Sequence, residues 1–429
     1  MYVQRLFINN LRSFREAEVA FCYPGCEGGS PELPNVTLLL GDNGAGKTSV
    51  LRAISLATLA PVIEGSGFVP YNLVRRSGKG LSRAKQAEVR AEVLLHGQDT
   101  GSKDRSATQE ARVRTLIERR GDVERVRSPE PPEGVWEEMF TDRSPAFLVL
   151  GYGASRRVES SASFDSGLRA KARLLRYQRV SGLFEEGVTL TPLGAWLPEF
   201  RKENPGRHKQ VINLLNRLLP EGTRILDEAE NGEYVFEHQD TRVPFAAMSD
   251  GYRAYIGWVA DLLYHVCMGA PSNAKLVDNR GIVLVDEIDL HLHPEWQRVV
   301  VPQLARVLPN LQFILTSHSP IVAGTLHAAN LRVIEPDEAG ASVVRRLEER
   351  VHGLNADQIL LSSYFGLTST RAPEAVNELR ELSRQARGGD REAVKQFLRK
   401  LSHTTLAEEP AGAEAEVAAA TPSPRKRKR

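Results

Sequence analysis

The chain has 429 residues, of which 41% are hydrophobic and 26% charged, a composition typical of a globular protein with two or three domains. Its 56 basic and 54 acidic residues give a net charge of +2, which excludes a strongly basic nucleic-acid-binding protein and leaves only local basic surfaces. We see no signal peptide, and the most apolar long segment, 256–270, is too short to span a bilayer and contains Asp261, so we expect a cytoplasmic protein without membrane contact.

Cysteine usage agrees with a reducing compartment, because the chain has only three cysteines. Cys22 and Cys26 are spaced like half of a metal site. A second pair is missing, since Cys267 stands alone, so we expect free thiols.

The first predicted elements are a β-hairpin over 2–21, a strand over 36–40 and a helix that begins near residue 49. Between strand and helix lies a glycine-rich loop with the P-loop pattern G-x-x-x-x-G-K-[ST], in the strand–loop–helix context that the pattern requires. The loop is Gly41-Asp42-Asn43-Gly44-Ala45-Gly46-Lys47-Thr48. A chance match in a glycine-containing turn is the alternative.

The chemistry of this loop predicts a nucleoside triphosphate with Mg²⁺. Its glycines allow positive φ and close approach of the backbone, so that N–H groups from Asn43 to Ser49 can surround phosphates at a helix N-terminus. We expect Lys47 to reach the β- and γ-phosphates and the Thr48 hydroxyl to bind the metal.

The middle of the chain alternates predicted strands and helices. A strand-like run at 89–95 is followed by a polar, charged stretch and by a Pro-rich breaker at 128–134. Further on, the sequence predicts a buried strand, a mostly helical region and a hairpin, at 146–153, 167–220 and 233–245. In the helical region, apolar residues spaced for one face are Val211, Leu214, Leu215 and Leu218.

Two short runs of apolar residues, 281–285 and 312–315, predict parallel strands that are buried on both faces. An amphipathic helical region follows at 374–401. From residue 404 on, the Ala-, Glu- and Pro-rich sequence predicts a disordered tail, which ends in five basic residues at 425–429.

The strand at 281–285 is followed directly by Asp286 and Glu287. An Asp in this position can hold Mg²⁺ on the phosphates, and an adjacent Glu can polarise the attacking water. A strand that simply ends in polar residues is the alternative. Asp286 lies 239 positions after Lys47 (286 minus 47), a separation that indicates a long insertion between the two motifs.

Three further motifs accompany these two: Met248-Ser249-Asp250-Gly251-Tyr252, Ile288-Asp289-Leu290-His291-Leu292-His293-Pro294 and Thr316-Ser317-His318-Ser319-Pro320. In this order the set resembles the ABC-type ATPases of the SMC, RecF and OLD kind, over about residues 1–370. The resemblance implies a P-loop α/β fold with a mixed sheet, an inserted mainly helical lobe and a helical C-terminus. It also implies ATP, Mg²⁺ and a head-to-tail dimer with shared sites.

Residue roles follow from the resemblance. Ser249 and Gly251, in the place of the signature motif, are expected to bind the γ-phosphate held by the other protomer. Asp289 lies in the D-loop, and His318 matches the switch histidine that contacts the γ-phosphate. Asp250 and Tyr252 depart from the usual Gly and Gln, and we expect Asp250 to turn away from the phosphate toward the helix dipole.

The sequence leaves two questions open, the role of a histidine pair and the identity of the Q-loop residue. His291 and His293 could ligate a metal, although packing at a helix start is the simpler interpretation. The family's Q-loop glutamine has no counterpart after the strand at 146–153, where the sequence is Gly151-Tyr152-Gly153-Ala154-Ser155-Arg156-Arg157, so that residue stays unassigned.

Within the family, the motifs at 151–156, 249–253 and 286–294 resemble the ATPase subunits of bacterial anti-phage systems such as Septu, its retron-linked relatives and PARIS. The resemblance implies a separate effector nuclease. The Toprim nuclease domain of OLD proteins has no counterpart here, because no Asp-x-Asp follows residue 345, so we expect no nuclease activity in this chain.

One local basic stretch could bind DNA or RNA. Between residues 156 and 179, seven basic residues face only Glu159 and Asp165. The seven are Arg156, Arg157, Arg169, Lys171, Arg173, Arg176 and Arg179. A solvated face or a protein contact is the alternative.

The expected domains are ATPase lobe I at 1–95, an inserted lobe at 96–230, ATPase lobe II at 231–345, a helical region at 346–403 and the tail at 404–429. The leading hypothesis is an ATPase that senses or regulates for a partner nuclease, as a homodimer or a larger homo-oligomer. A RecF-like DNA-repair ATPase and a nucleotide-gated scaffold without turnover are the alternatives.

Overall fold

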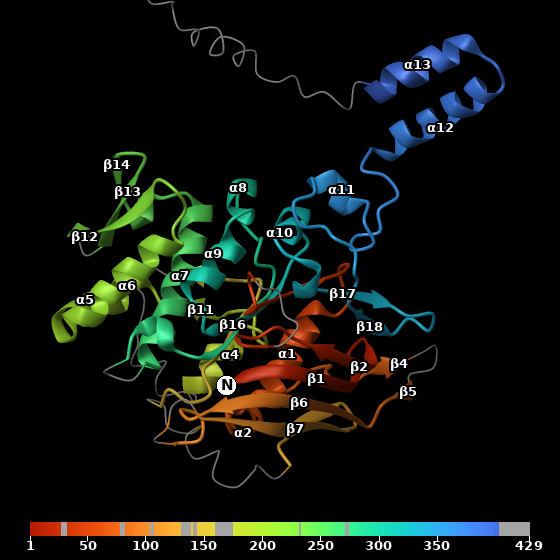
Figure 1. Cartoon of the computed structure of the whole chain (residues 1–429). Helices are drawn as coiled ribbons and strands as arrows, with labels where there is room; N and C mark the ends of the chain where they lie inside the picture. Colours follow the sequence, from red (N-terminus) through yellow and green to blue (C-terminus); the bar gives the residue numbers. More distant parts are fainter. Residues whose placement is uncertain are drawn as a thin grey trace, which may run out of the picture. The chain divides into compact units, whose positions relative to one another are not determined.

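The structure is a computed structural model. It describes residues 1–26, 32–77, 82–102, 104, 107–129, 139, 144–158, 175–230, 233–270 and 274–402. The chain divides into two compact units, Met1–Gly366 and Leu367–Arg429. The tail at 404–429 and most of the Pro-rich breaker lie outside the described residues. The first unit contains every motif singled out above, and its elements are labelled in Figure 1.

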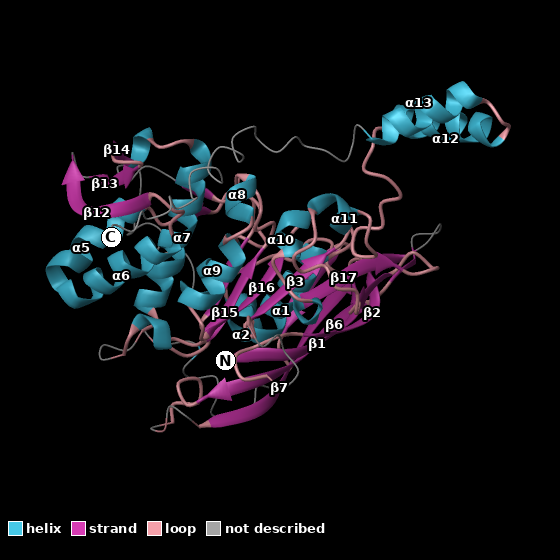
Figure 2. Ribbon diagram, turned by 45° about the horizontal axis from the view of Figure 1, so that its top comes forward, coloured by secondary structure: helices cyan, strands magenta, loops and turns pink. Residues whose placement is uncertain are grey.

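A six-stranded mixed sheet forms the centre of the first unit (Figures 1 and 2). Its strands, in spatial order, are β18 (Ser342–Arg345), β17 (Leu331–Pro336), β3 (Val36–Leu40), β16 (Leu311–Thr316), β15 (Gly281–Val285) and β9 (Val149–Tyr152). All neighbours are parallel except β18, which is antiparallel to β17. Every residue of β3, β15 and β16 is buried, which confirms the prediction of parallel strands covered on both faces.

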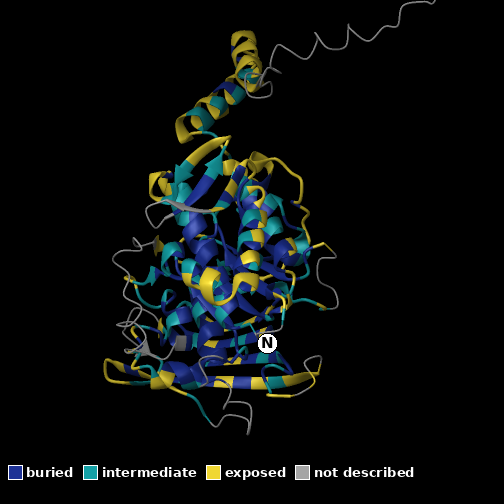
Figure 3. Cartoon of the chain, turned by 90° about the vertical axis from the view of Figure 1, so that its left-hand side faces the viewer, coloured by how far each residue is buried: buried dark blue, intermediate teal, exposed yellow. Residues whose placement is uncertain are grey.

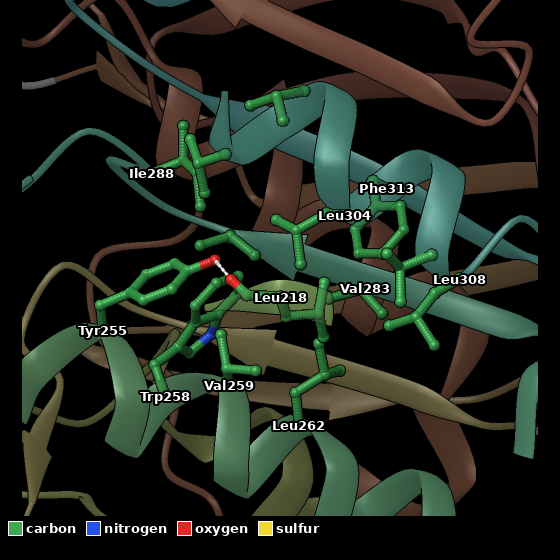
Figure 4. Packing of buried hydrophobic residues seen from close by; sticks show 14 of the residues in the cluster. Leu218, Tyr255, Trp258, Val259, Leu262, Val283, Ile288, Leu304, Leu308 and Phe313 are labelled. Atoms are coloured by element: carbon green, nitrogen blue, oxygen red, sulfur yellow. Dashed lines mark hydrogen bonds between the residues drawn. The ribbon is translucent and has the colours of Figure 1, made fainter. Parts of the chain in front are cut away.

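Helices cover one face of this sheet. Because side chains alternate along a strand, Leu38, Val283 and Phe313 point to this face. They pack against α6 (Pro205–Leu218), α7 (Asp250–Met268) and α9 (Val300–Val307). Figure 4 shows this core from close by, including the hydrogen bond from the Tyr255 hydroxyl to the Leu218 carbonyl (2.7 Å).

The other face carries α1 (Lys47–Thr58) and a second sheet. Leu39, Leu284 and Ile314 point to this side and share a core with both. The second sheet is antiparallel and contains β2 (Phe14–Ala20), β1 (Tyr2–Leu11), β6 (Gln86–His96), β7 (Thr108–Arg120) and β8 (Val123–Arg127) in this order. Figure 3 shows the buried residues between these layers and the exposed ones on the outer surfaces.

The hairpin predicted over 2–21 is confirmed by β1 and β2, and the strand at 89–95 by the longer β6. The polar stretch that follows folds as β7 and β8, because its few apolar residues alternate: Val113 and Ile117 are buried in β7 while charged neighbours face outward. β6 pairs with β7 along its whole length, so the expected domain limit at 95/96 falls inside a hairpin. The other expected domain limits are not tested by this pairing, and the domain division as a whole remains a prediction.

The helical region at 167–220 contains α4 (Leu175–Ser181), α5 (Leu193–Glu203) and α6 in its described part. The predicted apolar face of α6 is buried, from Val211 to Leu218. The hairpin at 233–245 is confirmed as β13 (Glu233–His238) and β14 (Thr241–Pro244), with β12 (Thr223–Glu230) as a third strand. The described part of the second unit contains two amphipathic helices, α12 (Pro373–Arg387) and α13 (Arg391–Ser402).

Short elements complete the described chain: α2 (Ala60–Gly65), α8 (Pro294–Gln297), α10 (Pro320–Gly324), α11 (Ala356–Leu360), β4 (Arg76–Ser77), β5 (Ser82–Arg83), β10 (Arg157–Val158) and β11 (Thr189–Leu190). Among the residues described, no helix has the length and apolar character needed to cross a membrane. The predicted α/β class with a mixed sheet is confirmed.

Candidate nucleotide-binding site

Four motifs meet at one edge of the central sheet. The strands β3, β9, β15 and β16 are parallel, so their carboxyl ends lie at the same edge, and this is where ligands bind in open α/β sheets. The P-loop follows β3, the segment 153–156 follows β9, the carboxylate pair follows β15 and the segment 317–318 follows β16. The sheet thereby joins residues that are more than 200 positions apart.

Three glycines of the P-loop adopt positive φ angles, which favour glycine. Gly41, Gly44 and Gly46 have φ of 145°, 80° and 112°. A Cβ on Gly41 would lie 2.3 Å from the Ile334 carbonyl oxygen, and one on Gly46 would lie 2.7 Å from a ring carbon of Phe14. Two of the three glycines are therefore fixed by packing as well as by φ.

Two serines, one at the start of β18 and one in the turn after β1, hold the P-loop backbone, and sequence reasoning missed both. The Ser342 hydroxyl donates to the Ala45 carbonyl (2.6 Å), and the Ser13 hydroxyl reaches the same oxygen at 3.4 Å. Ser342 lies at the start of β18, far from the loop in sequence. No local signal connects these serines to the P-loop, because only the tertiary fold brings β18 and the turn after β1 beside it.

Lys47 is the first residue of α1, and its side chain folds back onto the P-loop. Its Nζ donates to the carbonyls of Gly41 (2.7 Å) and Asp42 (3.0 Å). Burial lowers the Lys47 pKa, while the nearby carboxylates, above all Asp286 and Glu287, act to raise it. Asp42, Asn43 and Gly44 are exposed at the loop tip, whereas Ser49 is buried.

Asp286 is held by two threonines. Thr48 Oγ1 donates to its Oδ2 (2.7 Å), and Thr316 Oγ1 donates to its Oδ1 (2.7 Å). Its backbone N–H donates to the Tyr152 carbonyl (2.8 Å). The predicted metal residues Thr48 and Asp286 are therefore in direct contact, and Thr316 is a third member that sequence reasoning did not single out.

Glu287 has an unusual backbone for a residue that is not glycine, with φ of 50°. Its N–H donates to Thr316 Oγ1 (2.8 Å). Its carbonyl oxygen accepts from Arg156 Nη2 and from the Leu290 N–H (3.0 Å). The half-buried Glu287 is thus fixed by its backbone directly beside Asp286.

The site fits Mg²⁺ by its donor set. A threonine hydroxyl and a carboxylate already within hydrogen-bond distance are the oxygen ligands that this ion takes beside phosphate oxygens. Asp289 adds a buried Oδ1 without a hydrogen-bond partner among the described residues. Thr48 and Asp286 would hold the ion.

The two histidines after Glu287 occupy a helix start. His293 is exposed and caps α8, because its Nδ1 accepts from the Glu295 N–H (3.4 Å). His291 is also exposed. Within the part of the chain that the structure describes, no group of three His, Cys, Asp or Glu side chains could hold a metal. The interpretation as helix-start residues agrees with this geometry.

The motif at 248–252 begins α7. Ser249 occupies the N-cap position, is exposed, and its side chain makes no capping hydrogen bond. Asp250 pairs with Arg253 on its own helix, and its orientation toward a bound phosphate stays a prediction. A Cβ on Gly251 would lie 2.9 Å from the His291 carbonyl oxygen, so its close approach is to the D-loop of the same chain.

Tyr252 has a packing role in the place of the usual glutamine. Its ring meets Trp296 edge-on, with centroids 4.2 Å apart. Trp296 belongs to α8, which follows the D-loop. Tyr252, which stands where the family pattern has glutamine, therefore packs the start of α7 against α8.

His318 lies in the turn between β16 and α10. Two serine hydroxyls satisfy backbone N–H groups of this turn: Ser317 Oγ accepts from the Ser319 N–H (2.9 Å), and Ser319 Oγ accepts from the Ile321 N–H (3.1 Å). His318 itself is half-buried at the sheet edge. The structure brings it to the same edge as the P-loop, as the sequence predicted.

The basic stretch at 156–179 is not a continuous exposed face. Arg176 and Arg179 are 1% and 3% exposed, and Arg176 donates to the Phe147 carbonyl (3.2 Å). Arg156 is half-buried and donates to the Glu287 carbonyl at the carboxyl edge of the sheet. Arg169, Lys171 and Arg173 lie outside the described residues. Arg176 and Arg179 are therefore too buried to contact nucleic acid in this fold. Nucleic-acid binding by the rest of the stretch stays a prediction.

The cysteines are free thiols. Cys22 and Cys267 are buried and Cys26 is half-buried. A hydrogen bond with Cys26, together with burial, raises the Cys22 pKa far above that of an exposed thiol. Burial likewise raises the pKa of Cys267 to about 12, so the two buried cysteines stay protonated at neutral pH.

A family model described as "AAA domain, putative AbiEii toxin, Type IV TA system" matches residues 36–323, from the P-loop strand to α10. This is about two thirds of the chain. The chain belongs to this AAA family. The match includes all the motifs at the sheet edge.

Two curated proteins with sequences similar to this chain are also named as Septu or retron proteins. "Septu protein PtuA" of Bacillus mycoides is 25% identical in an alignment of 381 positions that covers 86% of this chain and 45% of that protein. "Retron Ec83 probable ATPase" of Escherichia coli is 23% identical in an alignment of 365 positions that covers 70% of this chain and 67% of that protein. The chain thus spans less than half the length of the first relative. The expected resemblance to Septu and retron ATPases is confirmed.

Among solved structures, an SMC head bound to the C-winged helix domain of ScpA matches with a TM-score of 0.49 and 17% identity. The match covers 81% of this chain and 98% of the SMC head chain.

Proposed function

We propose that the chain is a cytoplasmic ATPase that binds and hydrolyses ATP as a homodimer and regulates a separate effector nuclease in anti-phage defence. The observation that carries hydrolysis is the contact of Asp286 with Thr48, with Glu287 next in the chain and Lys47 at the same sheet edge. The defence role and the partner rest on the similarity to Septu and retron ATPases.

In this proposal the P-loop N–H groups and Lys47 hold the phosphates. Lys47 must exchange the carbonyls of Gly41 and Asp42 for phosphate oxygens, which its flexible side chain permits. Glu287 accepts a hydrogen bond from water and orients it for attack, and His318 contacts the γ-phosphate. A Mg²⁺ ion held by Thr48 and Asp286 would neutralise charge on the phosphates.

In this proposal, a second copy of the chain contributes Ser249 to the nucleotide site. Its hydroxyl and the first N–H groups of α7 form a helix N-terminus that its own side chain leaves uncapped. We propose that this end binds the γ-phosphate held by the P-loop of the partner. Each site then needs two chains, so ATP binding and dimerisation are one event.

The test is Glu287→Gln, which keeps the shape of the side chain and removes the base. With ATP and Mg²⁺, sedimentation velocity should show a stable dimer of this variant, whereas wild type returns to monomer as ATP is consumed. Glu295→Gln, an exposed substitution in α8, is the matched control and should behave as wild type. A Glu287→Gln chain that stays monomeric and hydrolyses ATP at the wild-type rate would refute the mechanism.

A further inference from the structure

Arg156 lies where the chain leaves the end of β9. Its Nη2 donates to the Glu287 carbonyl, so it contacts the loop that follows β15. Its Cζ also lies 5.8 Å from the centroid of the Trp258 ring, within the range of a cation–π contact. Trp258 is 1% exposed on α7, the helix that begins at Ser249. One side chain therefore touches both the carboxylate loop and the signature helix.

The surroundings of Arg156 are acidic. Burial lowers the pKa of Arg156 to about 10, while Asp286, Asp289 and Glu287 act to raise it. The guanidinium thus stays charged at neutral pH and offsets three carboxylates in a small volume. A buried cation is retained only where such partners compensate for its lost hydration.

The Glu287 backbone needs support from its neighbours. A left-handed φ is unfavourable for a residue with a side chain, because its Cβ crowds the backbone. The Thr316 hydroxyl holds the N–H of Glu287, while Arg156 and the Leu290 N–H hold its carbonyl. Among these partners, only Arg156 connects the loop to α7.

We propose that Arg156 is the positioning residue of the catalytic loop: it fixes the Glu287 backbone and couples it to the signature helix. This inference rests on the proposed function, in which Glu287 orients the water. Arg156 follows the strand after which the family pattern places its Q-loop glutamine. Because it touches both elements, a shift of α7 when Ser249 meets the partner's nucleotide reaches Glu287 through Arg156.

The first test is steady-state ATP hydrolysis by full-length Arg156→Ala and Arg156→Lys, with Arg157→Ala as control, because Arg157 is exposed and next in the chain. We expect kcat of Arg156→Ala to fall about 100-fold, the usual cost of a misplaced catalytic group, with KM within about threefold of wild type. The lysine variant, which can still donate to the carbonyl, should regain about tenfold. A kcat of Arg156→Ala near wild type, or a loss that appears in KM instead, would overturn the proposal.

The second test does not depend on turnover. In nucleotide-free protein, hydrogen exchange of the peptide 286–292 should be about tenfold faster in Arg156→Ala than in wild type and unchanged in Arg157→Ala. Unchanged exchange in Arg156→Ala would show that Arg156 does not position the loop. If exchange responds as expected but wild type hydrolyses no ATP, the proposed function fails while the positioning role stands.

Discussion

Thr316 offers the sharpest test of how the carboxylate loop is held. Its side chain is fully buried, and its hydroxyl both donates to Asp286 Oδ1 and accepts from the Glu287 N–H. Thr316→Val keeps the shape and removes both hydrogen bonds. The change leaves a buried carboxylate oxygen and a backbone N–H without this partner.

The magnitude follows from these two losses. A hydrogen bond to a charged acceptor is worth about 2 kcal/mol, and a buried N–H without a partner costs about 1–3 kcal/mol. Thr316→Val should therefore lower the free energy of unfolding by about 3–5 kcal/mol. Thr316→Ser keeps the hydroxyl and loses one methyl group, which costs about 1 kcal/mol.

The assay is equilibrium urea unfolding of wild type and both variants, followed by far-UV circular dichroism. The account predicts that Thr316→Val is less stable than Thr316→Ser by about 2 kcal/mol or more. Equal stability of the two variants would refute the reasoning, because it would mean that the hydroxyl carries no net hydrogen-bond energy at this position.

Two further predictions concern the P-loop and pH. Gly41→Ala should abolish binding of a fluorescent ATP analogue, because its Cβ would meet the Ile334 carbonyl at 2.3 Å, whereas Gly121→Ala in the β7–β8 turn, where nothing lies within 4 Å, should bind normally. Burial lowers the His265 pKa from 6.5 to about 4, although Asp261 acts to raise it. The unfolded chain therefore binds the proton more readily. Through this residue, the free energy of unfolding should fall by about 2 kcal/mol between pH 7.5 and pH 5, as measured by urea unfolding at the two pH values. If His265→Gln shows the same fall as wild type, His265 is not the source of this pH dependence.

The sequence predicted the sheet edge well because each motif directly follows a short apolar run. Parallel strands such as β15 and β16 are buried on both faces, and only such runs satisfy that environment. Once the strands are parallel, their carboxyl ends coincide, and Lys47, Asp286 and His318 must meet there. The P-loop and the carboxylate pair could therefore be placed without a structure.

Other features were beyond local pattern. Thr316 bridges Asp286 and Glu287 only because β15 and β16 are neighbours in register, which the sequence does not state. Arg156 and Arg176 look like members of a basic stretch, yet Arg156 is half-buried against the Glu287 carbonyl and Arg176 is buried against the Phe147 carbonyl. The β7 strand was hidden by its charged outer face, because few of its residues are apolar.

The central claim is that each catalytic site combines the P-loop of one chain with Ser249 of another. Mixing two inactive chains, Lys47→Ala and Ser249→Arg, tests it most directly. If sites are shared, mixed dimers contain one site with both motifs intact, and an equimolar mixture should recover about a quarter of the wild-type ATPase rate. A mixture no more active than the two variants measured apart would contradict the account.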